Sequence, residues 1–255
     1  MYASSVSYIL KEAQIRVWWI VFCFFVTCAT CYWLSEDLFF GLATPYLKIS
    51  KTSFFICTQI TESLNTYIII SLILGFFFCA PYMIYQIWCF FIPSCNEDQR
   101  RAASKIIIFS MVAFFFVLII TFHWIMPNIW LFLYKLSNTE SGAQFFIIKL
   151  QPKIYDFSIL TLRILLAASL CSQIPILIIC SVQYNLISIQ TLMRNRRVST
   201  FISLLLAALI TPPDVWCQLS AWFCMLFLIE LAFFTAIVQL QYSNRLMKAR
   251  NVLVL

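Results

Sequence analysis

The sequence predicts an all-α fold, a polytopic membrane protein with six transmembrane helices. Hydrophobic residues make up 63% of its 255 residues and charged residues 11%, whereas a soluble domain has about 25% charged residues. The apolar stretches are also continuous, and several approach or exceed the roughly 20 residues that cross a bilayer. A transmembrane β-barrel would instead show alternating segments of about ten residues. A bundle of membrane-spanning helices is therefore the expected fold class.

Six apolar stretches are the expected spans, and together they form a single integral membrane domain over residues 1–255. They cover residues 17–34, 67–92, 106–134, 157–182, 199–210 and 215–238. Tryptophan and tyrosine residues flank the first stretch, as amphipathic rings do at membrane interfaces. Pro81, Pro127 and Pro175 fall inside spans, where a proline removes a backbone hydrogen bond and tends to kink the helix. We expect kinked helices that form a curved wall, with kinks that serve packing alone as the alternative.

Charge predicts the orientation, because basic residues stay on the side from which the chain inserts. An even number of spans puts both termini on one side. That side carries eleven basic residues against three acidic ones, a balance of +8, and the other side carries five against six, a balance of −1. We therefore expect both termini inside, facing the cytoplasm or the matrix or stroma of an organelle. The basic residues are interpreted as local anchors, and nucleic acid is not an expected partner.

Residues that could carry catalysis or hold a metal are scarce. Cys28 and Cys31 form a C-x-x-C pair with no second pair and no histidine beside it, so packing is favoured over redox or metal chemistry. The single histidine, His123, lies in the third span, where packing is favoured over a proton-carrying role. The three glycines cannot supply a phosphate-cradling loop, and no nucleotide-binding or hydrolase motif occurs. We expect a protein that is not an enzyme and has no cofactor or metal.

Three motifs along the chain point to one family. Residues 80–101 read "APYMIYQIWCFFIPSCNEDQRR", and the hinge "LITPPDVWCQ" precedes a span that contains "LIELAFF". Near the N-terminus "LKEAQIR" is similar to the pattern L-x-E-L-R-x-R, in which Leu10, Glu12 and Arg16 match and Gln14 replaces an arginine. This combination resembles the TatC family, the core subunit of twin-arginine protein translocation. The resemblance covers nearly the whole chain and implies six spans with a short fifth span.

The resemblance implies that the inner side binds the paired arginines of a substrate's signal peptide. A guanidinium prefers carboxylates in a fixed fork geometry, and the acids on the inner side are Glu12, Glu97 and Asp98. Gln99 stands where the family commonly has a glutamate, and its amide can still accept a hydrogen bond. Ordinary pairing of these acids with nearby arginines is the alternative. The candidate signal-peptide-binding residues are Glu12, Arg16, Phe90, Glu97, Asp98, Gln99, Arg100 and Arg101.

A second set of candidates concerns structure and translocation. The fifth span has 12 residues and is about 18 Å long, against a hydrocarbon core of about 30 Å. Such a span would thin the bilayer or shelter behind its neighbours. Two prolines stop this helix, and Asp214 either caps the next one or acts directly in translocation. The candidates are Pro45, Glu62, Gln173, Pro212, Pro213, Asp214 and Glu230.

Three of these candidates are polar residues with a family counterpart or an unusual depth. Glu62 matches a glutamate of the family, and Gln173 stands where some members have a glutamate. Glu230 lies within the sixth span, where a charge at the centre costs at least ~2.5–3.5 kcal/mol. It is interpreted as a polar contact for a single-span partner helix. An internal hydrogen bond to serine, threonine or glutamine is the alternative.

The implied function is the signal-recognising core of a translocase that moves folded proteins with the protonmotive force. The implied partners are twin-arginine signal peptides and single-span subunits of the TatA and TatB type, in a homo- or hetero-oligomer. A subunit of a respiratory complex and a small-solute transporter are the alternatives, but no row of proton-carrying residues and no internal repeat is found. Abundant phenylalanine and cysteine favour an organelle-encoded, mitochondrial-type member. We expect the mitochondrial inner membrane with termini in the matrix, over a bacterial plasma membrane or a plastid thylakoid.

Overall fold

The computed structural model describes residues 2–49, 55–94, 97–137, 152–183, 188–211 and 215–253. These residues form an all-α structure, as predicted, and the β-type contact recorded among them is an isolated parallel bridge between Ile56 and Lys153. The chain forms two compact units. Unit 1 contains Met1–Ala103 and Trp130–Leu166, and unit 2 contains Ser104–Ile129 and Ala167–Leu255. Each unit is described separately below.

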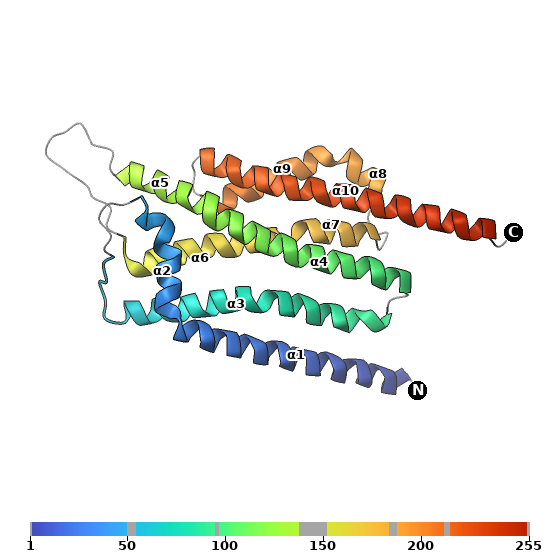
Figure 1. Ribbon diagram of the computed structural model, residues 1–255, viewed down its shortest axis with the longest axis horizontal. Coiled ribbons are helices and arrows are strands. Elements are labelled where there is room, and N and C mark those ends of the chain that lie inside the picture. The colour runs from blue at the N-terminus through green and yellow to red at the C-terminus, as the bar shows by residue number, and fades with distance from the viewer. Residues whose placement is uncertain are drawn as a thin grey trace. The chain divides into compact units, whose positions relative to one another are not determined.

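The described residues contain ten α-helices, one 3-10 turn and one π-helical turn (Figure 1). The first helices are α1 (Tyr2–Trp33), α2 (Ser35–Leu47) and α3 (Glu62–Phe91), and the 3-10 turn Ile92–Ser94 follows them. Next come α4 (Glu97–Ile120), the π-helical turn Thr121–Ile125 and α5 (Met126–Ser137). The remaining helices are α6 (Ile154–Cys171), α7 (Ile174–Gln183), α8 (Ile189–Arg194), α9 (Arg196–Ile210) and α10 (Val215–Leu253).

In unit 1, α1 and α3 lie side by side over most of their lengths (Figure 1). The closest approach is at Gly75, where an added Cβ would lie 2.7 Å from Cys28 Sγ and 3.2 Å from Cys28 Cα. Thr27 of α1 also donates a hydrogen bond from Oγ1 to the Gly75 carbonyl oxygen at 3.3 Å. The missing side chain of Gly75 therefore allows the two helices to pack closely. Cys31 is buried, which agrees with the packing interpretation of the Cys28 and Cys31 pair.

An aromatic cluster fills the other end of unit 1. Tyr46 of α2, Trp130 of α5 and Phe157 of α6 are almost fully buried, and the rings of Trp130 and Phe157 stack with centroids 4.4 Å apart. Phe39 and Phe55 pack against this core with their rings at steep angles. Such aromatic pairs contribute about 0.5–1.5 kcal/mol each beyond their buried area. The cluster holds α2, a helix that the span analysis did not anticipate, against α5 and α6.

In unit 2, α10 packs against α7 and α9. Ile106 of α4, Ile179 of α7 and Ala232 of α10 form one buried cluster, and α4, α6 and α10 meet in a second. Trp222 of α10 donates its indole N–H toward the Thr200 carbonyl oxygen at 3.4 Å and the Ser203 Oγ at 3.2 Å. These contacts set the register between α9 and α10.

The prolines inside the expected spans have three different local outcomes. α3 continues as one helix through Pro81. Before Pro127 the chain forms a π-helical turn, in which the Met126 N–H bonds the Thr121 carbonyl oxygen five residues back. The widened turn relieves the clash that a proline ring makes with the carbonyl four residues earlier. Before Pro175 the helix breaks, so that the fourth expected span consists of α6 and α7.

Five helical stretches are long and apolar enough to cross a membrane: Ser7–Trp33, Glu62–Phe91, Ala103–Leu136, Ile154–Val182 and Val215–Val238. They correspond to five of the six predicted spans. The predicted fifth span, 199–210, lies in α9, which has 15 residues and is about 22 Å long. The total of six crossings, the single domain and the inner location of the termini remain predictions.

Candidate functional site

A groove lies between α1 and α3 in the half of unit 1 that contains the start of α1 and the end of α3 (Figure 1). Its volume is about 500 Å³, and it is lined by Glu12, Ile15, Arg16, Trp19, Tyr82 and Gln86. The four α1 residues are spaced by three and four positions, so they share one face of that helix. On α3, Gln86 donates from Nε2 to the Tyr82 hydroxyl at 2.6 Å. The groove thus has a charged edge on α1 and a polar, aromatic wall on α3.

Glu12 and Arg16 form an ion pair at the edge of this groove. Arg16 Nη2 donates to Glu12 Oε1 at 2.6 Å, and the Glu12 side chain is 45% exposed. A pair of this kind, four residues apart on a helix surface, contributes only about 0.3–0.5 kcal/mol. This is the ordinary charge pairing that the sequence left open as an alternative. Glu12 is the more exposed partner, since the Arg16 side chain is 23% exposed, so another guanidinium can reach the carboxylate.

The remaining candidate residues of this site follow α3. Phe90 is partly buried near the end of α3. Its ring centroid lies 5.6 Å from that of Phe91, and the two ring planes are inclined at 75°. Glu97 begins α4, and its side chain is exposed. The first turn of α4 lies at the same end of unit 1 as the start of α1 (Figure 1). Arg100 and Arg101 are exposed on that turn. The side chains of Asp98 and Gln99 lie outside the described residues.

The structure adds four residues to the groove that the sequence analysis did not single out. They are Ile15, Trp19, Tyr82 and Gln86. The available signal was a tyrosine and a glutamine four residues apart near the end of a strongly apolar span, since that spacing puts them on one helix face. Sequence alone could not show that α1 and α3 lie side by side.

Glu62 is buried at the opposite end of α3 from this groove. Its side chain is 7% exposed, and its Oε2 accepts from the Thr58 N–H at 2.7 Å, the Thr58 hydroxyl at 2.9 Å and the Gln59 N–H at 3.3 Å. Its Oε1 accepts from the Tyr155 N–H in the first turn of α6 at 3.4 Å. A buried carboxylate needs such donors, and the start of a helix favours negative charge. Glu62 therefore fastens the segment before α3 to the start of α6.

Pro45 and Gln173 both occupy packed positions at irregular points of the helices. Pro45 is buried inside α2 next to Tyr46 of the aromatic cluster. Gln173 lies in the break between α6 and α7, where its Oε1 accepts from the Ser110 hydroxyl of α4 at 2.9 Å. Its Nε2 donates to Ser172 Oγ at 3.3 Å. An amide can make both bonds at once, so Gln173 links the broken helix to α4.

Glu230 is paired with a residue that the sequence analysis did not consider. Arg196, the first residue of α9, approaches Glu230 with Nη2 to Oε2 at 3.5 Å. The Arg196 guanidinium also lies over the Phe233 ring, 5.6 Å from its centroid. Both charged side chains are about 40% exposed. The internal partner of Glu230 is thus an arginine, rather than the serine, threonine or glutamine that the sequence alternative named. Pro212, Pro213 and Asp214 lie outside the described residues.

This arrangement defines an integral membrane protein with five long apolar helical stretches and, among the described candidate residues, polar groups in a groove between α1 and α3, at a helix break and in an ion pair between α9 and α10. Comparison with known proteins then assigns the family. Residues 8–224 match the family model described as Sec-independent protein translocase protein (TatC). The chain belongs to the TatC family.

The relatives agree with this assignment over most of the chain. A tatC-like protein of Arabidopsis thaliana is 45% identical over 230 residues, which is 90% of this chain and 81% of that protein. The TatC protein of Rickettsia prowazekii is 27% identical over 223 residues, 87% of this chain and 88% of that protein. A crystal structure of the twin-arginine translocase receptor TatC has the same fold, with a TM-score of 0.73 at 23% identity over 89% of this chain and 99% of the other. This chain is therefore a membrane component of the Sec-independent protein translocase, and its family is not one of enzymes.

Proposed function

We propose that this chain is the subunit that recognises the signal peptide, and that the groove between α1 and α3 binds the paired arginines of that signal. The observation that carries the proposal is the Glu12 carboxylate, half exposed at the edge of a groove of about 500 Å³. A guanidinium binds a carboxylate through two parallel hydrogen bonds, which makes the contact stronger than a single one. A protein of the same fold and known crystal structure is a twin-arginine translocase receptor, which supports the same role for this chain.

Binding proceeds by exchange of partners at Glu12. The first arginine of the signal replaces Arg16 on the Glu12 carboxylate, which is the more exposed partner of the pair. The second arginine is taken by the acidic first turn of α4, which begins with Glu97 and Asp98. The Gln86 amide offers a further acceptor oxygen, and the Trp19 ring offers a face on which a guanidinium can stack. Gln99 supplies a neutral acceptor where the family commonly has a carboxylate.

A binding measurement with matched variants tests this proposal. We expect Glu12→Ala combined with Glu97→Ala and Asp98→Ala to weaken binding of an arginine-pair signal by about 2–4 kcal/mol, since two charge-assisted contacts are lost. Arg16→Gln removes the internal competitor, so it should leave the affinity unchanged or raise it. Exposed Glu36 of α2 supplies the control variant, Glu36→Ala. Unchanged affinity of the triple variant would remove these acids from the site.

We further propose that single-span subunits of the TatA and TatB type bind beside α9 and α10. The Arg196 and Glu230 side chains are each about 40% exposed, so a polar group of a neighbouring helix can reach the pair from the membrane. Transport of folded cargo would use the protonmotive force. Glu230→Gln should lower the amount of single-span subunit that co-purifies while the protein still binds signal peptide. Equal co-purification with both forms would place the partners elsewhere.

The membrane is proposed to be the mitochondrial inner membrane, with both termini in the matrix. The family relatives include a tatC-like protein of Reclinomonas americana, 28% identical over 92% of this chain, and the TatC protein of Rickettsia prowazekii. The composition of the chain, with 26 phenylalanines and 11 cysteines against three glycines, supports an organelle-encoded member. Fractionation of the source cells tests this proposal, because recovery in a plastid or plasma membrane fraction would contradict it.

A further inference from the structure

An apolar groove in unit 2 has a single cation at one end. It lies among α4, α7 and α10, has a volume of about 340 Å³, and is lined by Lys105, Ile106, Phe109, Ile179, Phe234, Thr235 and Val238. Ile106 and Ile179 belong to a buried cluster that forms its floor. Phe234 and Val238 are 66% and 47% exposed at its rim. The groove therefore has a packed floor and opens to the side.

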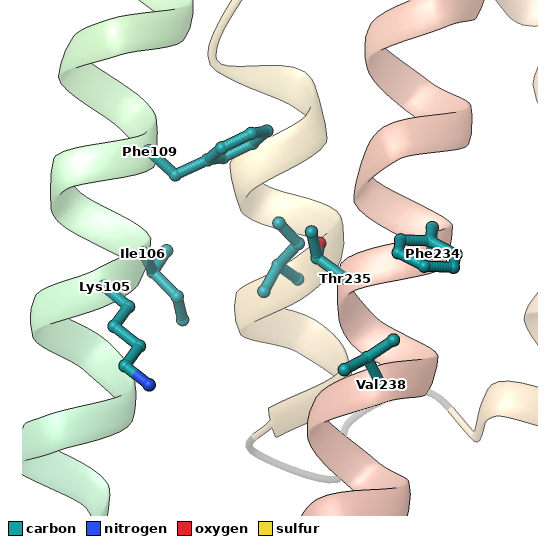
Figure 2. Close-up of a pocket in the computed structure, with 7 residues that line it drawn as sticks. Lys105, Ile106, Phe109, Phe234, Thr235 and Val238 are labelled. Carbon is teal, nitrogen blue, oxygen red and sulfur yellow. The ribbon is translucent and has the colours of Figure 1, made fainter.

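Lys105 is the charged residue of the lining, and apolar side chains make up most of the rest of it (Figure 2). Lys105 and Val238 lie at one end, and Phe109 lies at the other. The Thr235 hydroxyl is already used, since it donates to the Ala232 carbonyl oxygen at 3.0 Å. Lys105 is exposed, and it has no ion-pair partner within the described ranges. An ammonium group is thus available at one end of a groove whose lining is otherwise mostly apolar.

We propose that this groove binds one acyl chain of an anionic phospholipid, with the lipid phosphate on Lys105. The ammonium of Lys105 at one end suits a negative head group, and the apolar side chains of Ile106, Phe109 and Phe234 suit an acyl chain. Basic positions between transmembrane helices on the inner side are suited to anionic head groups. This lipid site is independent of signal recognition, which was proposed for the groove between α1 and α3 in unit 1.

The size of the groove favours a hydrocarbon chain over a protein helix. An α-helix with side chains is about 10–12 Å wide and rises 5.4 Å per turn, so one turn occupies about 400–600 Å³. The groove, at about 340 Å³, cannot enclose a whole turn, so a helix could contact it only by packing across its open rim. A single acyl chain is narrow enough to lie along the floor between Phe109 and Val238.

Native mass spectrometry of the full-length protein, purified from vesicles with equal amounts of phosphatidylglycerol and phosphatidylcholine, tests the site. We expect the wild type to retain phosphatidylglycerol in preference to phosphatidylcholine. Lys105→Gln should lower that preference about fivefold, the effect of one cation held next to a bound anionic head group. Lys105→Arg should preserve it. Val238→Trp, which blocks the groove from its exposed rim, should reduce the retention of both lipids.

The control is Lys11→Gln, which removes an exposed cation of α1 that lies outside the groove. It should leave the lipid preference unchanged. Equal retention of both lipids by the wild type, or an unchanged preference in Lys105→Gln, would overturn the proposal. Loss of a co-purified single-span subunit in Val238→Trp with unchanged lipid retention would also overturn it, because a protein would then be the occupant.

Discussion

Gly75 decides how closely α1 and α3 pack, and its substitution gives the clearest stability prediction at the scale of one residue. In Gly75→Ala the new Cβ would meet Cys28 Sγ at 2.7 Å and the Cys28 backbone at 3.2 Å. We expect a loss of about 1–3 kcal/mol, as overpacking of a tight contact typically costs. A lower thermal midpoint in detergent would report it.

Gly41 provides the matched control for this substitution. A Cβ at Gly41 would meet nothing within 4 Å, and alanine is the better helix former. Gly41→Ala should therefore leave the midpoint unchanged or raise it. Adding Cys28→Ala to Gly75→Ala should recover only part of the loss, because the backbone of residue 28 stays close. Equal midpoints for Gly41→Ala and Gly75→Ala would show that the helices are not held at this contact.

The ion pair between Arg196 and Glu230 leads to a second prediction at this scale. Reversing one charge, as in Glu230→Arg, puts like charges on adjacent helices and should destabilise the protein by about 1 kcal/mol, given the partial exposure of both groups. Reversing both, with Arg196→Glu, should recover most of the loss. The contact of the guanidinium with the Phe233 ring would not be restored. Thermal midpoints of the four forms give the coupling, and strictly additive losses would show that the pair contributes nothing.

At the scale of the element, α9 is distinguished by its shortness, since it has only 15 residues. Inserting four leucines after Leu206 adds about 6 Å and turns the preceding part of the helix by about 40°. We expect the protein to insert and to bind signal peptide but to transport cargo poorly, because the longer span relieves the mismatch that thins the membrane. A transport assay with folded cargo measures this effect.

Two controls separate the length of α9 from its contacts. The insertion also shifts Arg196 away from Glu230 and changes the register of Thr200 against Trp222. The double variant Arg196→Gln with Glu230→Gln removes the pair without changing the length, so the transport that it loses measures the contribution of the pair alone, and the insertion should lose more. Three inserted leucines, which turn the helix by about 60° the other way, control for facing. Normal transport with both insertions would make the shortness of α9 a matter of packing alone.

The helices also show what sequence patterns could predict and what they could not. Long apolar runs predicted all five of the described helical stretches that can cross a membrane, since a span requires little more than length and hydrophobicity. The outcome at each proline depends on neighbours, so a sequence could not tell that α3 continues through Pro81 while the chain breaks before Pro175. α2 is held by the contacts of Tyr46 with Trp130 and Phe157, which come from distant parts of the chain.

The sequence named two of the residues that line the groove, Glu12 and Arg16, because they belong to one local motif. It did not single out Tyr82 and Gln86, because their place in the groove depends on the packing of α3 against α1. Arg196 was likewise missed as the partner of Glu230, since 34 positions separate them and only the antiparallel packing of α9 and α10 brings them together.

At the scale of the whole molecule, the charge balance of +8 against −1 predicts the sidedness. Single cysteines introduced at Arg100 and Arg196, and a tag at the C-terminus, should all be reached by membrane-impermeant reagents from the inner side only. Sealed vesicles of the two orientations allow the comparison. Labelling of the C-terminal tag from the outer side would contradict six crossings.

The central claim, that an arginine-pair signal binds in the groove between α1 and α3, is tested most directly by site-specific photo-crosslinking. A photoreactive residue replaces Gln86, which lines the groove, or Leu72, which is exposed elsewhere on α3. A signal peptide with two arginines should crosslink from position 86 and not from position 72, and changing its two arginines to lysines or adding Glu12→Ala should abolish most of the product. Crosslinks of equal yield at both positions, or a yield at position 86 that does not depend on the two arginines of the signal, would contradict this account.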